Sequence, residues 1–117
     1  MITMRNEESA LNQINGTYKV GSLDGVSYSD ILRVLGEPTF NDESPDGKVQ
    51  VEWVVAHKAD VFTVYDWKTY DLDYTLNKLT NWSVGGKTDP TDFIREFRKQ
   101  LEEKLHSRLY KSPPIIY

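Results

Sequence analysis

Cysteine is absent from this chain of 117 residues, and histidine occurs only twice. Without cysteine the chain can form no disulfide, no thiolate metal site and no cysteine nucleophile. His57 and His106 lack the clustered histidine or carboxylate spacing that is typical of metal ligands. We therefore expect no metal and no other cofactor.

Long apolar runs are also absent, and so is an excess of positive charge. No segment reaches the ~18 consecutive apolar residues of a membrane span, and residues 1–8 lack the apolar core of a signal peptide. The net charge of −4 argues against a protein that binds duplex DNA through its phosphates. These features predict a cytoplasmic protein with neither a membrane nor duplex DNA among its partners.

The length fits a single domain, so residues 1–117 are expected to share one core. Residues 1–15 are mostly polar and predict an N-terminal arm or a short helix. Residues 110–117 predict a non-helical tail, because two consecutive prolines cannot continue a helix. The tail ends in apolar residues, which predicts docking on the body or on a neighbouring subunit. Together with the surplus of rings it favours a homo-oligomer.

Two segments carry helix signals. Residues 27–36 begin with Ser27 and Asp30 in the spacing of a capping box, and Gly36 can end the helix. Residues 90–109 follow Asp89 as the expected cap, with a proline at the first helical position. In this second segment large apolar residues recur every four positions, at Phe93, Phe97, Leu101, Leu105 and Leu109. This spacing predicts a long helix with one broad apolar stripe.

The strand signals lie between these helices and before the first one. Residues 17–23 predict a first strand, and residues 49–55 and 61–67 predict an antiparallel hairpin with a five-residue connection. Residues 68–80 alternate weakly and are consistent with a further strand or an aromatic-lined loop. Residues 82–84 predict a short strand that could lie at an edge. The whole pattern predicts an α+β fold: an antiparallel meander with a central hairpin, packed by a short helix and a long C-terminal helix.

The sequence Gly85-Gly86-Lys87-Thr88 is similar to the end of a phosphate-binding loop. The full motif needs a glycine where this chain has Asn81, and a helix that begins at the glycine–lysine step. Here Asp89 and the following proline restart the helix later and add negative charge. We therefore interpret the segment as a turn in which the glycines adopt positive φ.

Catalytic groups are scarce. Asp66 lies in a predicted strand between two aromatic residues and is the strongest candidate for an acid or a base. A carboxylate in such a place more often pairs with a neighbour such as Lys68 or points to water. No nucleophile-elbow pattern occurs. We expect that the protein is not an enzyme.

Aromatic residues make up 12% of the chain, and they serve either a ring-rich core or a stacking surface. Guanidinium groups beside such rings can bind a phosphate or a carboxylate. On this reasoning we predict a ligand-binding set in which rings from the hairpin meet cations near the last helix. Its members are Trp82, Arg95, Arg98, Lys87, Tyr65 and Trp67.

Four motifs together suggest a family. They are Gly36-Glu-Pro-Thr39, Glu52-Trp53, Tyr65-Asp-Trp-Lys68 and Trp82-Ser-Val-Gly-Gly86. With them the chain resembles, over roughly residues 26–105, a group of small accessory proteins encoded by bacteriophages. The resemblance implies a role against host immunity. Among such proteins, those that counter Thoeris defence sequester a cyclic nucleotide signal as oligomeric sponges.

Two alternative functions are therefore expected. The first is a viral anti-defence protein that binds and sequesters a small nucleotide immune signal without catalysis. The alternative is a protein-binding inhibitor of a host defence nuclease or effector. That inhibitor would use the acidic loop 41–47 and exposed rings such as Trp67 as its contact residues.

Overall fold

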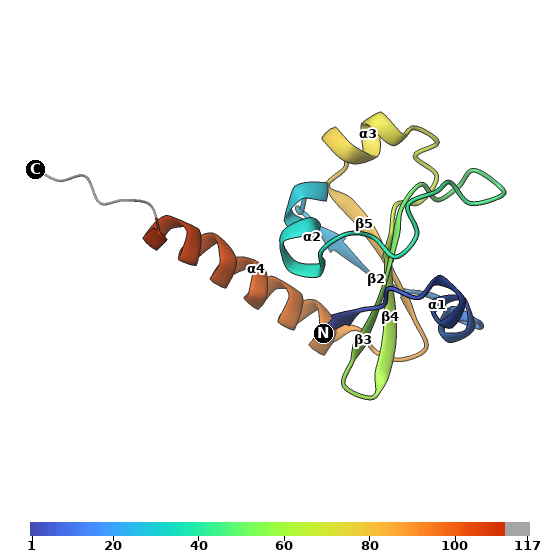
Figure 1. Ribbon diagram of the computed structural model, residues 1–117, viewed down its shortest axis with the longest axis horizontal. Coiled ribbons are helices and arrows are strands. Elements are labelled where there is room, and N and C mark those ends of the chain that lie inside the picture. The colour runs from blue at the N-terminus through green and yellow to red at the C-terminus, as the bar shows by residue number, and fades with distance from the viewer. Residues whose placement is uncertain (112–117) are drawn as a thin grey trace, which may run out of the picture.

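A computed structural model describes residues 1–111 of the chain, with side chains up to His106. It contains a five-stranded antiparallel sheet in the order β1-β3-β4-β5-β2 and four helices (Figure 1). The predicted α+β class is confirmed. In chain order the elements are β1 (Ile2–Thr3), α1 (Glu7–Ile14), β2 (Tyr18–Asp24), α2 (Tyr28–Leu35), β3 (Glu52–His57), β4 (Asp60–Tyr65), α3 (Leu72–Asn77), β5 (Asn81–Gly86) and α4 (Thr91–Lys111).

The predicted hairpin is formed by β3 and β4, but its connection is shorter than five residues. His57 pairs with Asp60, so only Lys58 and Ala59 form the turn, and Lys58 has a φ of 56°. On the other side of β4 lies β5, which also pairs with β2. The strand predicted at residues 82–84 is therefore present as β5, but it has six residues, and the suggested edge position is wrong because β5 is interior.

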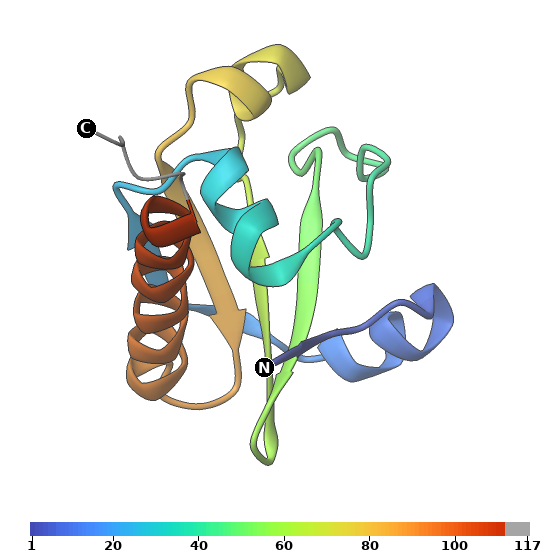
Figure 2. The same cartoon turned by 60° about the vertical axis from the view of Figure 1, so that its left-hand side comes forward.

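The two faces of the sheet are covered differently. Helices α2 and α4 lie over one face, and α1 lies over the other (Figures 1 and 2). The α2/α4 face carries the main core, in which the rings of Trp53 and Trp82 meet edge to face with centroids 5.7 Å apart. Both indole N–H groups donate to backbone carbonyls, that of Trp53 to Gly36 and that of Trp82 to Val26. These bonds fix the loops that flank α2 to the sheet.

The helix ends follow the sequence signals closely in two cases. In α2 the capping box between Ser27 and Asp30 is present, and Gly36 follows the helix with a φ of 77°. Helix α4 begins after Asp89, whose carboxylate accepts from the backbone N–H of Thr91 at 2.9 Å. It continues to Lys111, two residues into the segment predicted as a non-helical tail. The rest of that tail, and its predicted docking, lie outside the described residues.

The predictions for two other segments need correction or completion. Residues 68–80 form neither a strand nor only a loop, because Asp71 accepts from the backbone N–H groups of Asp73 and Tyr74 and starts the short helix α3. The open question about residues 1–15 is answered by α1, which Asn6 caps. The edge strand β1, which pairs with β3, was not predicted because only two residues take part.

Gly85 and Gly86 do not form the predicted turn. Both lie in β5, and neither has positive φ. They are close to neighbouring side chains instead: a Cβ atom on Gly85 would lie 2.6 Å from Thr63 Oγ1, and one on Gly86 would lie 2.9 Å from the Phe62 ring. The reason for glycine here is close packing within the sheet, and not an unusual backbone conformation.

Candidate functional site

The structure does not bring the predicted ligand-binding set together. Trp82, the central ring of that set, is fully buried between the sheet and α2, with a relative exposure of 0%. Its place in the ligand-binding set is wrong, because its ring packs on Tyr28 and Trp53 and its N–H is already bonded to Val26. The sequence could not show this, since a tryptophan that stacks on a ligand and one that fills a core have the same local pattern.

The three predicted cations also lie apart from the rings. Lys87 follows β5 and lines a hollow of about 200 Å³ with Thr17 and Asp60, at the end of β4 opposite Tyr65. Arg95 is on the exposed side of α4, 3.7 Å from Asp92. Arg98 donates to the backbone carbonyl of Asp24 at 3.1 Å. Within one chain these groups therefore do not converge on a common ligand.

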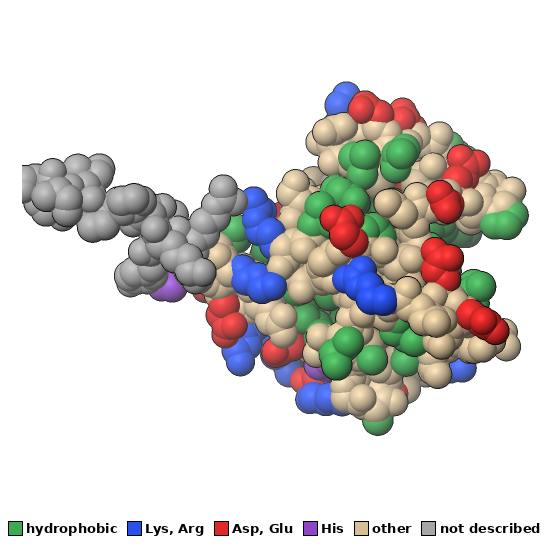
Figure 3. Space-filling view, in the orientation of Figure 1, with side chains coloured by type: hydrophobic (Ala, Val, Ile, Leu, Met, Phe, Trp, Pro, Cys, Tyr) green, Lys and Arg blue, Asp and Glu red, His purple; other side chains and the backbone are tan. Residues whose placement is uncertain are grey.

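Tyr65 and Trp67 do lie together, next to further exposed rings. Their centroids are 6.2 Å apart in an edge-to-face arrangement. Trp67 is 48% exposed and Tyr70 60% exposed, and Leu72 and Tyr74 are exposed as well. Hydrophobic side chains are visible at the surface over α3 (Figure 3). We call the four exposed residues Trp67, Tyr70, Leu72 and Tyr74 the aromatic tip.

Asp66 holds the segment that carries the aromatic tip. Its carboxylate is fully buried and accepts four hydrogen bonds of 2.7–3.1 Å. The donors are the backbone N–H groups of Gln50 and Val51 and the hydroxyls of Thr69 and Thr75. Asp66 therefore has a structural role. All of its hydrogen-bond acceptor capacity is used to join the end of β4 to the start of α3 and to the chain before β3.

The backbone of the tip is bent by two residues with positive φ. Lys68 has a φ of 57° and Tyr70 a φ of 53°, and neither is glycine. Such conformations are unfavourable for ordinary L-residues and persist only where the surroundings enforce them. Here two contacts hold the backbone in these conformations. They are the hydrogen bonds to the buried Asp66 carboxylate and the 2.8 Å hydrogen bond from the Lys68 N–H to the Lys48 carbonyl. The rings are thus presented on an anchored segment.

Positive charge lies close to the central ring of the tip. The ammonium groups of Lys48 and Lys68 lie 5.7 and 5.5 Å from the Trp67 ring centroid. These are cation–π distances. Beside them an open cleft of about 490 Å³ is lined by residues that include Trp67, Lys68, Tyr74 and Asn81. The two lysines were not predicted from sequence, since only the folded hairpin places Lys48 beside Trp67.

A second hollow, of about 330 Å³, lies on the α1 side of the sheet, between α1 and the acidic loop. Its wall combines apolar residues such as Leu11 and Phe40 with four carboxylates, those of Glu7, Asp42, Glu43 and Glu52. Burial raises the pKa of Glu52 to about 7, the nearby Asp66 charge adds to this, and the hydroxyl of Thr63 opposes it. The same Glu52 charge contributes to the raised pKa of Tyr65, after burial.

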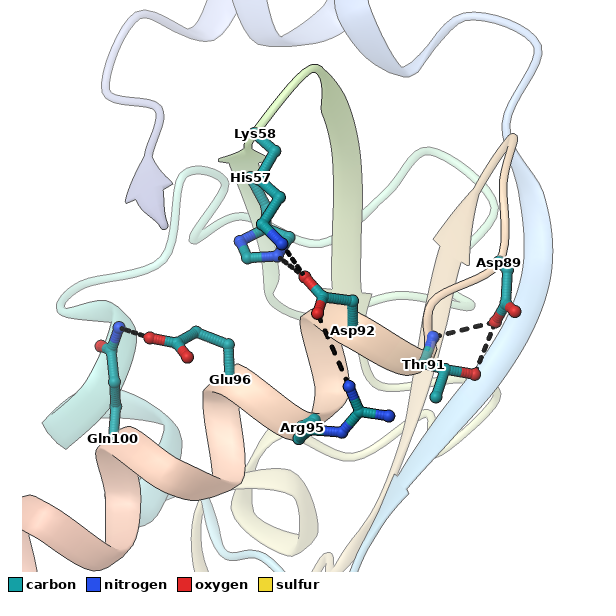
Figure 4. A network of polar contacts seen from close by, with 8 residues as sticks. All are labelled: His57, Lys58, Asp89, Thr91, Asp92, Arg95, Glu96 and Gln100. Carbon is teal, nitrogen blue, oxygen red and sulfur yellow. Dashed lines mark hydrogen bonds and ion pairs between the residues drawn. The ribbon is translucent and has the colours of Figure 1, made fainter.

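A polar network joins the hairpin end to the start of α4 (Figure 4). Asp92 lies 2.8 Å from both His57 Nε2 and Lys58 Nζ. The hydrogen bond with Lys58 and then that with His57 lower the pKa of Asp92 to about 2. His57 is almost fully buried against the Phe93 ring. Arg95 lies 3.7 Å from the same carboxylate, so the network positions the start of α4 on the end of the hairpin.

Residues 1–111 contain no group of three or more histidine, aspartate or glutamate side chains arranged to hold a metal ion. Among the same residues, no helix has both the length and the apolar character needed to cross a bilayer.

The sequence predicted the aromatic tip only in part. Trp67 was in the predicted ligand-binding set, whereas Tyr70, Leu72 and Tyr74 were not. The signal that could have revealed the tip is Asp71, a helix cap placed among alternating rings. No family model, curated protein or solved structure matches the chain, so its function has to be inferred from this site.

Proposed function

We propose that the protein is a non-catalytic binding protein whose aromatic tip contacts a protein partner. The observation that carries this proposal is the exposure of Trp67, Tyr70, Leu72 and Tyr74 together on one anchored segment. Large exposed rings are unfavourable in water unless they are covered in a complex. Tryptophan and tyrosine are also the residues that most often dominate the affinity of protein interfaces.

The anchoring of the tip supports binding in a second way. A segment that is already fixed loses little conformational freedom when it binds, and this lowers the free-energy cost of association. The four hydrogen bonds to Asp66 and the positive φ values at Lys68 and Tyr70 fix this segment before any partner arrives. The complementary surface would be an apolar depression flanked by carboxylates, which would reach Lys48 and Lys68 beside the Trp67 ring.

The resemblance to bacteriophage accessory proteins suggests where such a partner is to be sought. A viral protein of this kind would bind a nuclease or effector of host defence and inhibit it by occupying its surface. A role in binding agrees with the environment of Asp66, because this carboxylate is fully occupied by structural hydrogen bonds.

The test is a comparative capture experiment with three forms of the chain. The wild type, Trp67→Ala and Leu11→Ala are immobilised and exposed to lysate of a bacterial host. Leu11 is an exposed apolar residue on α1, away from the tip, and serves as the matched control. A specific partner should be retained by the wild type and the control, and lost with Trp67→Ala. With the purified partner, the affinity should fall by about 30-fold or more. Equal recovery with all three forms would exclude the tip as the contact surface.

Sequestration of a nucleotide signal is the second candidate, favoured by the surroundings of Trp67. An indole ring with two ammonium groups within 5.7 Å, beside a cleft of about 490 Å³, combines a stacking surface with charges that suit a phosphate. Lys87, Arg95 and Arg98 are not required by this version of the proposal.

Isothermal titration with a panel of cyclic and linear nucleotides tests the second candidate. Binding should weaken in Trp67→Ala and in Lys68→Ala, and the ligand should be recovered chemically unchanged after release. Lys78→Ala, an exposed lysine beyond the end of α3, is the control for a general loss of positive charge. If no member of the panel binds, this candidate is excluded, and the protein-partner proposal is tested independently by the capture experiment.

A further inference from the structure

The C-terminal part of α4 extends beyond the sheet (Figure 1). Every side chain from Glu102 to His106 is exposed. Two polar contacts tie this part of the helix to the body: Arg98 donates to the carbonyl of Asp24, and Lys104 donates to the carbonyl of Arg33 at 2.6 Å. Short helices gain most of their stability from packing of an apolar face, so a projecting helix with such a face is expected to have a partner.

The apolar stripe of α4 gradually turns away from the body. Residues four apart differ by about 40° around a helix of 3.6 residues per turn. Phe93 and Phe97 are therefore fully buried against the sheet, Leu101 is half-buried, and Leu105 is 40% exposed. In the sequence the same spacing continues to Leu109. The stripe thus serves the core at one end of α4 and faces outward at the other.

The outward part of the stripe forms a shallow groove with charges of both signs at its rim. Its volume is about 370 Å³, and Leu101 and Leu105 form its apolar floor. Arg98 and Glu102, one turn apart, lie on the rim. A helix with the same ridge spacing fits such a surface, because ridges formed by residues four apart pack between one another at a crossing angle of about −50°.

We propose that this groove is a self-association site, occupied by the same part of α4 from a second copy of the chain running in the opposite direction. A two-fold arrangement brings each surface against itself, so one favourable contact is made twice. It places Leu101 of the two copies together and brings Arg98 of each copy towards Glu102 of the other. The charge pattern is therefore complementary to its own inverted copy, which is the reason to choose a second copy over an unrelated partner.

The small size of the groove sets the strength of the association. Stable complexes commonly bury about 1,600 Å² in total, and two projecting helix ends offer less than this. The dimer is therefore expected to be weak and concentration-dependent, with a dissociation constant between about 10 µM and 1 mM. The association site is separate from the aromatic tip, so it does not depend on the proposed function.

A charge-exchange experiment tests the pairing directly. Arg98→Glu and Glu102→Arg each place like charges against one another in a homodimer, so each variant alone should remain monomeric in sedimentation equilibrium. An equimolar mixture restores two opposite-charge contacts and should form a heterodimer, with association close to that of the wild type. Circular dichroism of each variant checks that α4 is still folded. A wild type that is monomeric up to about 1 mM, or a mixture no heavier than its components, would overturn the proposal.

The absence of cysteine permits a second, independent measurement. Contact of Arg98 with Glu102 of the other copy places the two-fold axis near residue 100, so the single thiol of Leu101→Cys should lie near its counterpart and form a disulfide-linked dimer under mild oxidation. Leu11→Cys carries a more exposed thiol on α1 and is the control. Crosslinking at least tenfold faster at position 101 than at position 11 supports the two-fold pairing of α4. Equal rates at the two positions contradict it.

Discussion

Replacement of Glu52 by glutamine should stabilise the protein at neutral and alkaline pH. The side chain lies on the α1 side of the sheet, at the wall of the acidic hollow, and burial raises its pKa from 4.5 to about 7. Between these two values the folded protein holds a proton on Glu52 that the unfolded chain has already released. The stability of the wild type should therefore fall as the pH rises from about 4.5 to 7, and should then level off.

The magnitude follows from the two pKa values. One pKa unit corresponds to about 1.4 kcal/mol, so the complete ionisation of Glu52 costs about 3 kcal/mol of folding free energy. Glutamine has almost the same shape, and it can still accept from the hydroxyl of Thr63. At pH 8 the Glu52→Gln variant should be more stable than the wild type by up to about 3 kcal/mol, and at pH 4.5 the two should be nearly equal.

Urea denaturation at several values between pH 4.5 and pH 8.5 measures this effect. The control is Glu43→Gln, which removes an exposed carboxylate from the rim of the same hollow. The control should keep the pH dependence of the wild type, whereas Glu52→Gln should lose most of it. A wild-type stability that is flat between pH 5 and pH 7, or a slope that survives in Glu52→Gln, would refute the reasoning.

Three further predictions concern stability. Asp66→Asn turns one carboxylate oxygen into a donor facing other donors, so it should destabilise by about 3 kcal/mol in urea denaturation, whereas the exposed Asp73→Asn should not. Gly85→Ala places a methyl group 2.6 Å from Thr63 Oγ1 and should lower the free energy of unfolding by about 2 kcal/mol. In a double-mutant cycle with Thr63→Ala, the stability losses of the two single variants should sum to more than the loss in the double variant. The pKa of Asp92 is lowered from 3.8 to about 2, so its pairing with Lys58 and His57 stabilises the fold fully above pH 3.8, and this stabilisation is lost as the pH falls through about 2. An acid titration of the Asp92→Asn variant should therefore lack this loss of stability.

The elements with strong local signals were predicted from sequence. Helix α2 is an example, since Ser27, Asp30 and Gly36 act within a few residues of the helix that they bound. The start of α4 at Asp89 is of the same kind. In each case the interaction that fixes the structure is local, and so it is visible in the order of residues.

The errors concern features that depend on distant contacts. Lys58 adopts positive φ in a two-residue turn although it is not glycine or asparagine, because the pairing of β3 with β4 requires a tight connection. Gly85 was predicted to lie in a turn. Glycine occupies this position in β5 because a larger side chain would overlap with Thr63 on the neighbouring strand β4. The position of β5 between β4 and β2 is likewise a property of the whole sheet.

The candidate site also combines features that local sequence signals predicted with features that depend on distant contacts. The rings of Tyr65 and Trp67 were recognised from their types, but Trp82 was placed with them although it fills the core. The approach of Lys48 to the Trp67 ring joins residues that are far apart in the sequence, and only the fold establishes it. Composition indicates that the chain has more rings than a small core needs, whereas the choice of which rings are exposed depends on packing.

The three tryptophans have unequal surroundings, and this provides two intrinsic fluorescence signals. Trp53 and Trp82 are shielded from solvent, so their emission should lie at short wavelength and resist quenching by acrylamide until the chain unfolds. Trp67 is accessible to the quencher and lies beside two ammonium groups, so its emission should respond to any molecule that covers it. Unfolding and surface occupancy can therefore be followed separately in the unlabelled protein.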